Sequence, residues 1–165
     1  MGSGLPRDQP DSKSEEGATK LRGTKQPSGP SGLRGLDLPP KSLGRHILFV
    51  EDYPVNELMV QRMLEYAGFE VSTAGSGVIM DLLLRDGVVP DMFILDLMLP
   101  GEDGVSIMRR LRKDPRFAST PIIVLTAYKF TARDARRLGF DGYIRKPLDM
   151  ARFTSQIKKH FPGLA

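Results

Sequence analysis

The chain has 165 residues, of which 40% are hydrophobic and 27% are charged, and it carries a net charge of +4. This length allows one domain with a substantial tail, or one large domain, and the composition is that of a globular protein. The absence of cysteine excludes disulfide scaffolds, thiolate metal sites and cysteine nucleophiles. No apolar run approaches the ~20 residues of a membrane helix, and residues 1–10 have no signal-peptide core. We therefore expect a cytoplasmic protein without membrane contact, and the small net charge does not favour nucleic acid.

The first 44 residues differ in composition from the rest of the chain. Twenty of them are Gly, Pro or Ser, and none is aromatic. Such a segment buries too little apolar surface to offset the entropy of ordering it. We therefore expect a disordered tail or linker over residues 1–44 and a folded domain over residues 45–165. Seven Lys/Arg against five Asp/Glu make a nucleic-acid-binding arm the weaker interpretation of the tail.

From residue 45 onward, short apolar segments alternate with helical patterns. Pro54 can open the first helix and Gly68 can end it, while Asp114-Pro115 ends the third. In the first two helices, recurring apolar residues predict the buried faces: Val55, Leu58, Met59 and Met63, then Val78, Ile79, Leu82 and Leu83. Strands are expected at residues 46–50, 69–73, 91–95, 121–125 and 142–145, and helices around residues 54–67, 78–86, 105–113, 131–138 and 150–157.

This fivefold alternation of strand and helix predicts the fold class. Short apolar strands between amphipathic helices are typical of a parallel sheet that helices cover on both faces. The sequence thus predicts a doubly wound α/β domain. In such domains ligands bind outside the carboxyl ends of the strands, at a topological switch point.

Chemically useful side chains follow four of the five expected strands. Glu51 and Asp52 come directly after the first strand, Asp96 after the third, Thr126 after the fourth and Lys146 after the fifth. Taken singly, each is more often an ordinary surface or loop residue. Their joint placement at the edge that binds ligands makes an accidental arrangement the weaker interpretation.

The chemistry of this set points to phosphoryl transfer. Three clustered carboxylates repel one another and favour a hard cation, and Mg²⁺ accepts carboxylates, a carbonyl and waters as ligands. A carboxylate beside such a cation can attack phosphorus, while Lys146 neutralises charge on the phosphoryl oxygens and Thr126 donates a hydrogen bond to one of them. The sequence therefore predicts a site for an aspartyl phosphate.

Residues 46–161 resemble a response-regulator receiver domain of two-component signalling. The matching segments are 47–56, 94–104, 123–127 and 141–147, which stand in order and at the expected spacings. The resemblance implies a flavodoxin-like five-stranded sheet in the order 2-1-3-4-5 with five helices. It also implies a cis bond between Lys146 and Pro147.

The resemblance further implies a role for each site residue. Asp96 is the implied phosphoacceptor, Lys146 contacts the phosphate, and Thr126 and Tyr143 form a switch pair. Mg²⁺ or Mn²⁺ would be ligated by the side chains of Asp52 and Asp96 and the backbone carbonyl of Met98, with Glu51 acting through water. Two departures from the family pattern are Glu51, where aspartate is common, and Tyr53, where a small or amide residue is common.

Three alternatives compete with this interpretation. A haloacid-dehalogenase-like phosphohydrolase needs an acid two residues after its nucleophile, and Met98 at that position cannot transfer a proton. A receiver-like scaffold that never takes phosphate usually lacks the acceptor, the threonine or the lysine, all present here. The third alternative is a nucleic-acid patch at the end of the third helix, although such charges also stabilise a helix C-terminus. Its residues are Arg109, Arg110, Arg112, Lys113 and Arg116.

We expect a stand-alone receiver that is not an enzyme toward other substrates, and that catalyses only its own phosphorylation and dephosphorylation. Its expected phosphodonor is a histidine kinase or phosphotransfer protein. Its target would bind the face of the fourth helix, fifth strand and fifth helix, and no direct DNA binding is expected. A receiver fragment of a hybrid kinase is the alternative, because a linker such as residues 1–44 could join it to an upstream domain.

Overall fold

The computed structural model describes residues 42–164. The tail expected over residues 1–44 therefore lies outside the described residues, except for its last three. Strands and helices alternate strictly along the described chain. The elements are β1 (His46–Val50), α1 (Pro54–Tyr66), β2 (Glu70–Ala74), α2 (Gly77–Arg85), β3 (Met92–Asp96), α3 (Gly104–Lys113), β4 (Ile122–Thr126), α4 (Ala132–Leu138), β5 (Gly142–Arg145) and α5 (Met150–Lys158).

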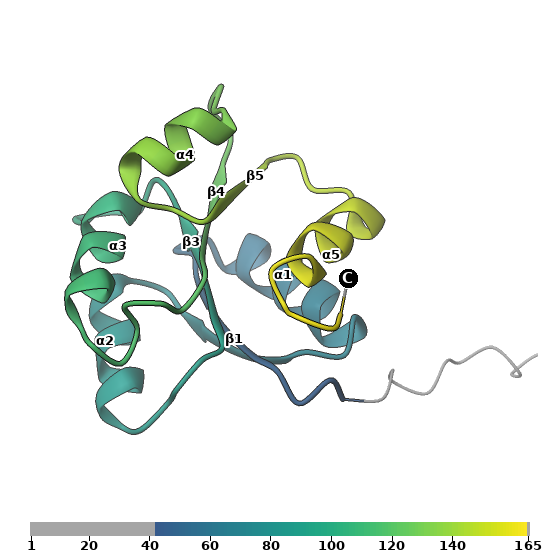
Figure 1. Cartoon of the computed structure of the whole chain (residues 1–165), viewed down its shortest axis with the longest axis horizontal. Helices are drawn as coiled ribbons and strands as arrows, with labels where there is room; N and C mark the ends of the chain where they lie inside the picture. Colours follow the sequence, from purple (N-terminus) through teal and green to yellow (C-terminus); the bar gives the residue numbers. More distant parts are fainter. Residues whose placement is uncertain (1–41, 165) are drawn as a thin grey trace, which may run out of the picture. The chain divides into compact units, whose positions relative to one another are not determined.

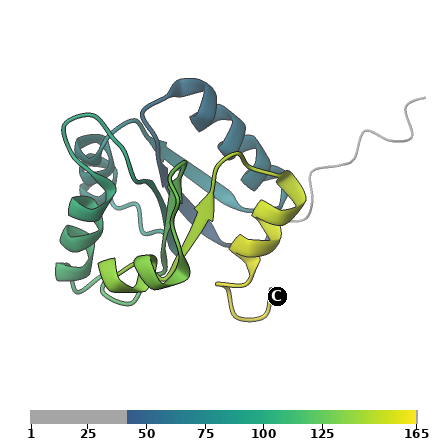
Figure 2. The same cartoon turned by 90° about the horizontal axis from the view of Figure 1, so that it is seen from above.

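The five strands form one parallel sheet in the order β2-β1-β3-β4-β5. Helices α1 and α5 cover one face of the sheet, and α2, α3 and α4 cover the other (Figure 1 and, from above, Figure 2). The chain order reverses direction between β1 and β3, which makes this the switch point of the sheet. The doubly wound fold and the strand order expected from the sequence are confirmed.

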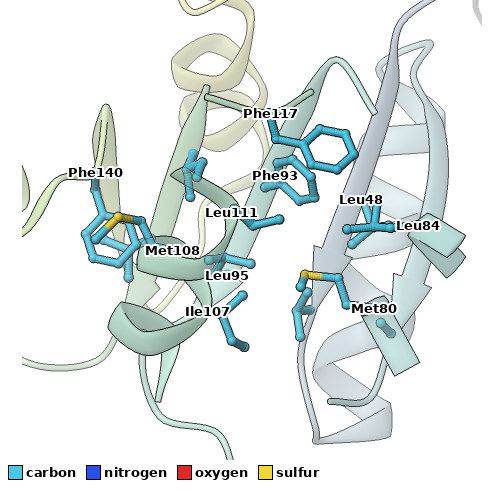
Figure 3. Close-up of a cluster of buried hydrophobic side chains, with 14 of the residues drawn as sticks. Leu48, Met80, Leu84, Phe93, Leu95, Ile107, Met108, Leu111, Phe117 and Phe140 are labelled. Atoms are coloured by element: carbon cyan, nitrogen blue, oxygen red, sulfur yellow. The ribbon is translucent and has the colours of Figure 1, made fainter. Parts of the chain in front are cut away.

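Each face of the sheet has its own hydrophobic core. The core under α2, α3 and α4 includes Leu95, Ile107 and Phe93, whose ring meets that of Phe117 edge-on at 5.2 Å (Figure 3). The opposite core lies under α1 and α5 and includes Phe49 and Phe153. Because strands β1, β3 and β4 are buried on both faces, their sequences are continuous apolar runs rather than alternating ones.

The structure corrects the expected buried faces of the first two helices. In α1 the buried side chains are Val60, Met63 and Leu64, so Met63 alone was assigned correctly. In α2 the buried residues are Gly77, Met80 and Leu84, and the expected Leu83 is partly buried against the same core. Both helices carry apolar residues on two sides, so the helical period fits two stripes equally well. The expected residues that are exposed instead are Val55, Leu58, Met59, Val78, Ile79 and Leu82.

The helix ends follow standard capping chemistry. Ser76, Asp103 and Asp149 each accept a backbone N–H of the first turn of α2, α3 and α5, and Thr131 forms a capping box with Asp134 at α4. Pro54 stands at the start of α1, as expected. In the part of the chain that the structure describes, no helix combines the length and apolar character needed to cross a membrane.

Candidate functional site

Three polar residues are buried in the described part of the chain, and all three lie at the carboxyl edge of the sheet. They are Glu51, which is 1% exposed, Asp96, which is 8% exposed, and Thr126, which is 1% exposed. The ends of the neighbouring strands β1, β3 and β4 position them. Since burying polar groups is costly unless they are paired, this edge is where the sheet departs from a purely apolar interior.

Lys146, which follows β5, pairs with both buried carboxylates. Its Nζ lies 2.8 Å from Oε2 of Glu51 and also donates to Oδ2 of Asp96. Its backbone N–H donates to the carbonyl of Thr126 at 2.8 Å, and its peptide bond to Pro147 is cis, as the family resemblance implies. One ammonium thus neutralises charge on two acids that lie at the ends of different strands.

This arrangement shifts the pKa values of its members. Burial raises the pKa of Glu51 and outweighs the hydrogen bonds from Lys146 and Asn56, which lower it. Burial lowers the pKa of Lys146, but hydrogen bonds and charge from Asp96 and Glu51 outweigh that effect, so its pKa is raised. The lysine therefore remains a fixed positive charge inside the site.

The second oxygen of Asp96 is held by the loop that follows β3. The backbone N–H of Met98 donates to Oδ1 of Asp96 at 2.9 Å. The loop closes on itself where the N–H of Gly104 donates to the carbonyl of Leu97 at 3.0 Å. A Cβ at Gly104 would lie 2.4 Å from the carbonyl oxygen of Asp96, so only glycine allows this close approach.

Thr126 and Tyr143 lie on neighbouring strands behind the carboxylates. Oγ1 of Thr126 accepts the N–H of Tyr128 at 3.1 Å. The half-buried Tyr143 packs its ring against Phe130, with centroids 5.8 Å apart. Thr126 is paired in register with Arg145, and Val124 with Tyr143, so Tyr143 lies on the neighbouring strand, two residues back along it from the partner of Thr126.

Asp52 differs from the other carboxylates, because its side chain is exposed. Among the described residues, no hydrogen bond or ion pair engages it, and no three His, Cys, Asp or Glu side chains gather closely enough to hold a metal on their own. Of the three carboxylates expected at this edge, Glu51 and Asp96 are bridged by Lys146, and Asp52 contributes no direct contact to that bridge. Asp52 stands at the solvent side of this pair.

Asn56 is a site residue that the sequence reasoning missed. Its Nδ2 donates to Oε1 of Glu51 at 3.1 Å, so both oxygens of the buried carboxylate are engaged. Its position in the first turn of a helix that begins after the acidic pair was the available signal. The backbone N–H of Tyr53 adds a longer contact of 3.4 Å to the same oxygen, while the Tyr53 side chain is exposed.

The basic residues at the end of α3 are mostly paired, and Arg110 reaches Glu102 in the loop that follows β3. Arg110 pairs with Glu102 and Asp81, Arg112 pairs with Asp141, and Arg116 pairs with Asp114. These contacts neutralise three of the five charges that could have formed a nucleic-acid patch. They favour a structural interpretation of the cluster.

A parallel sheet in this order, with a buried acid pair and a lysine at its switch point, is the architecture of a receiver. The family model of the response regulator receiver domain matches residues 47–158 of this chain. The chain is 37% identical to the phosphate regulon transcriptional regulatory protein PhoB of Rhizobium meliloti and 36% identical to the DNA-binding regulator RpaA of Synechocystis, over 68% of its length in each case. It spans about half of those proteins, 50% and 47% respectively.

Solved structures agree with this result. The receiver domain of the sensor histidine kinase PA1611 from Pseudomonas aeruginosa, solved with magnesium in its active-site cleft, is 29% identical with a TM-score of 0.62. The match covers 70% of this chain and 96% of that domain. The chain belongs to the response regulator receiver domain family, whose members are signalling switches of two-component systems.

Proposed function

We propose that Asp96 is the phosphoacceptor and that a phosphohistidine of a kinase or phosphotransfer protein is the donor. Glu51 and Asp96 are both buried at strand ends and both accept a hydrogen bond from Lys146, but Asp96 ends β3 and is 8% exposed, whereas Glu51 is 1% exposed and is also held by Asn56. Its nucleophilic oxygen forms the bond to phosphorus while the donor's nitrogen–phosphorus bond breaks. The single observation that carries this proposal is the bridge from Lys146 to Asp96 and Glu51.

Lys146 and Thr126 are proposed to bind the transferred group. The ammonium lies against Asp96, where it can neutralise negative charge on the phosphoryl oxygens during transfer. The buried hydroxyl of Thr126 keeps its proton available, because its oxygen accepts from Tyr128. Moving this hydroxyl toward the phosphoryl group would free space near Tyr143, so Thr126 and Tyr143 are proposed as the switch pair.

The oxygen atoms at the mouth of the site suit Mg²⁺ or Mn²⁺. The exposed carboxylate of Asp52, the carboxylate of Asp96 and the backbone carbonyl of Met98 are hard ligands, and Mg²⁺ typically needs only one or two carboxylates with waters. Glu51 is buried and held by Lys146 and Asn56, so we assign it an indirect role through water. When bound, the cation would neutralise negative charge on the transferring phosphoryl group.

The surface beside the site supports a protein as the phosphodonor. Three apolar side chains at the start of α1 are exposed: Val55 at 65%, Leu58 at 53% and Met59 at 45%. A pocket of about 410 Å³ opens next to them, between α1 and the loop after β5. Its lining is mostly apolar and includes Met59, Val60, Ala127, Lys146, Pro147 and Leu148. An apolar surface at the mouth of a charged site suits a helical protein partner.

The opposite side of the site supports a separate target surface. Arg133 and Arg136 of α4 are exposed, as are Arg145 at the end of β5 and Arg152 of α5. Arg145 and Arg152 line a pocket of about 350 Å³ together with Tyr143 and Phe130. We propose that a target with acidic groups binds this face of α4, β5 and α5, and that Tyr143 couples the face to Asp96. Residues 45–165 are proposed as the receiver unit and residues 1–44 as a tail or linker.

Metal-dependent labelling tests the proposed function. The protein is incubated with acetyl phosphate or a phosphorylated histidine donor, and acid-labile phosphate is measured by intact mass. We expect labelling with Mg²⁺ or Mn²⁺ and its loss in excess chelator. Equal labelling with and without chelator would exclude the proposed metal site, and no labelling by any donor would exclude phosphoacceptance.

A further inference from the structure

The loop between β3 and α3 carries atoms of the proposed site, and its half-buried Leu97 and Leu99 pack against the core on either side of Met98. Its two ends are tied by the hydrogen bond between Gly104 and Leu97. Its tip includes the exposed Met98, Pro100 and Gly101. The side chain that fastens the tip to the rest of the fold through charge is that of Glu102, the loop residue that enters an ion pair.

Glu102 pairs with Arg110, one and a half turns into α3. Both terminal nitrogens of the guanidinium contact the two carboxylate oxygens, with the second contact at 3.2 Å, which is the bidentate geometry that gives such pairs directional strength. The same arginine reaches α2, where Nη2 lies 3.2 Å from Oδ2 of Asp81. One side chain thus joins the acceptor loop, α3 and α2.

A glycine makes room for this arrangement. Gly77 begins α2, and a Cβ at this position would lie 2.2 Å from Oε2 of Glu102 and 3.1 Å from Nη2 of Arg110. The loop carboxylate therefore occupies the space that any side chain would take. The Glu102 carboxylate is thus placed by three features: the bidentate contact with Arg110, the contact of Arg110 with Asp81, and the absence of a side chain at Gly77.

We propose that Arg110 is a positioning residue for the metal and phosphate site, acting through Glu102 on the loop that carries Met98. The inference depends on the proposed function, since Met98 supplies the proposed carbonyl ligand and donates its N–H to Asp96. A loop already held in place loses less freedom when it binds a cation. Releasing Glu102 lets the Met98 carbonyl explore other positions, so part of that freedom must be lost at each binding event.

Mg²⁺ affinity tests this role directly and without phosphorylation. MgCl₂ is titrated into ¹⁵N-labelled protein, and the amide resonances of Met98 and Asp96 report the dissociation constant. Removing an outer-shell partner typically weakens metal binding by about tenfold or more. We expect that loss in Arg110→Met, whereas Gly77→Ala should lose less, because the flexible end of the Glu102 side chain can shift away from the added methyl group. The Mg²⁺ affinity of Arg110→Lys should lie between that of Arg110→Met and that of the wild type, because an ammonium can pair with Glu102 but cannot form the bidentate contact.

Arg116→Met is the matched control. It removes another arginine that pairs with an acid, Asp114 at 2.8 Å, just beyond the far end of α3. This variant should bind Mg²⁺ like the wild type. Thermal unfolding of all variants identifies any that do not fold, and Glu102→Gln then replaces Arg110→Met as the deciding variant. Wild-type affinity in folded Arg110→Met, or an equal loss in Arg116→Met, would overturn the proposal.

The wild type separates this inference from the proposed function. A wild type that binds Mg²⁺ but takes up no phosphate would refute phosphoacceptance, and the comparison of variants would still decide the role of Arg110. A wild type whose Met98 and Asp96 resonances do not respond to Mg²⁺ would refute the proposed metal site and the role of Arg110 with it.

Discussion

The Nζ of Lys146 lies 2.8 Å from Oε2 of Glu51, although 95 positions separate the two residues in the chain. The Glu51 side chain is 2% exposed and that of Lys146 is 21% exposed, so this contact lies largely out of water. Glutamate is one methylene longer than the aspartate common at this position. Here it is the residue that shares the ammonium with Asp96.

Removing the ammonium should destabilise the domain. Lys146→Met leaves Glu51 and Asp96 buried without a cation, at a cost of about 1–3 kcal/mol for groups that lose a charged partner. Burial already raises the pKa of Glu51 in the folded protein above its value in the unfolded chain. In acid, Glu51 is protonated and the loss of the ammonium costs less. The destabilisation by Lys146→Met should therefore grow as pH rises through the pKa of Glu51 in the folded protein. Chemical denaturation at several pH values measures it, with the exposed Lys159→Met as control. Equal stability of the two variants at neutral pH would contradict this account.

His160 should make the stability of the domain sensitive to acid. Burial lowers its pKa and outweighs the opposite effect of Asp141, and its ring packs where a Cβ at Gly142 would lie. Because the unfolded chain binds the proton more readily, stability is fully present above the unfolded pKa and falls as pH drops toward the lowered native pKa. In His160→Gln, the loss of unfolding free energy from about pH 7.5 to about pH 5.5 should be smaller than in the wild type. The same loss in both proteins would show that His160 is not responsible.

The phosphorylated state should be long-lived. Hydrolysis needs a water in line behind phosphorus, and the exposed side chains of Met98 and Tyr128 flank the site two residues after Asp96 and Thr126. A thioether holds water poorly, and the bulky tyrosine can shield the phosphoryl group. An orienting hydrogen bond contributes about 1 kcal/mol, more with charge, so Met98→Asn with Tyr128→Glu should speed dephosphorylation about tenfold. The decay after donor removal measures this rate, and an unchanged or slower decay would contradict the explanation.

Phosphorylation of Asp96 should change the structure of the face formed by α4, β5 and α5. The Thr126 hydroxyl and the Tyr143 ring form the proposed two-state element, and Phe130 contacts that ring directly. We expect amide shift changes to concentrate in residues 126–146, and Thr126→Ala to reduce them while labelling persists. Shift changes confined to α1 and α2 would exclude this route.

Much of this fold could be predicted from sequence because its strands are unusually regular. The apolar run at residues 46–50 and the polar residues after β1, β3, β4 and β5 fix the sheet and its functional edge. The exact strand order came from the family resemblance, since alternation alone allows other orders. The buried faces of α1 and α2 could not be predicted, because Val55 and Val60, or Ile79 and Met80, are equally apolar and only packing distinguishes them.

The contacts inside the site were less predictable than its residues. Strand-end positions brought Glu51, Asp96, Thr126 and Lys146 to one edge, but they do not determine which acid faces the lysine. That Asp52 is exposed while its neighbour Glu51 is buried follows from the turn into α1, which no local pattern specifies. The contacts of Asn56 with Glu51 and of Arg110 with Glu102 depend on side-chain reach across elements.

The central claim is that Asp96 accepts the phosphoryl group. The most direct measurement is mass-spectrometric mapping of acid-labile phosphate after incubation with donor and Mg²⁺, comparing wild type, Asp96→Asn and the exposed control Asp86→Asn. The account predicts phosphate on Asp96 in the wild type and in Asp86→Asn, and none in Asp96→Asn. Labelling of Asp96→Asn at the wild-type rate, or phosphate mapped to another residue in the wild type, would contradict it.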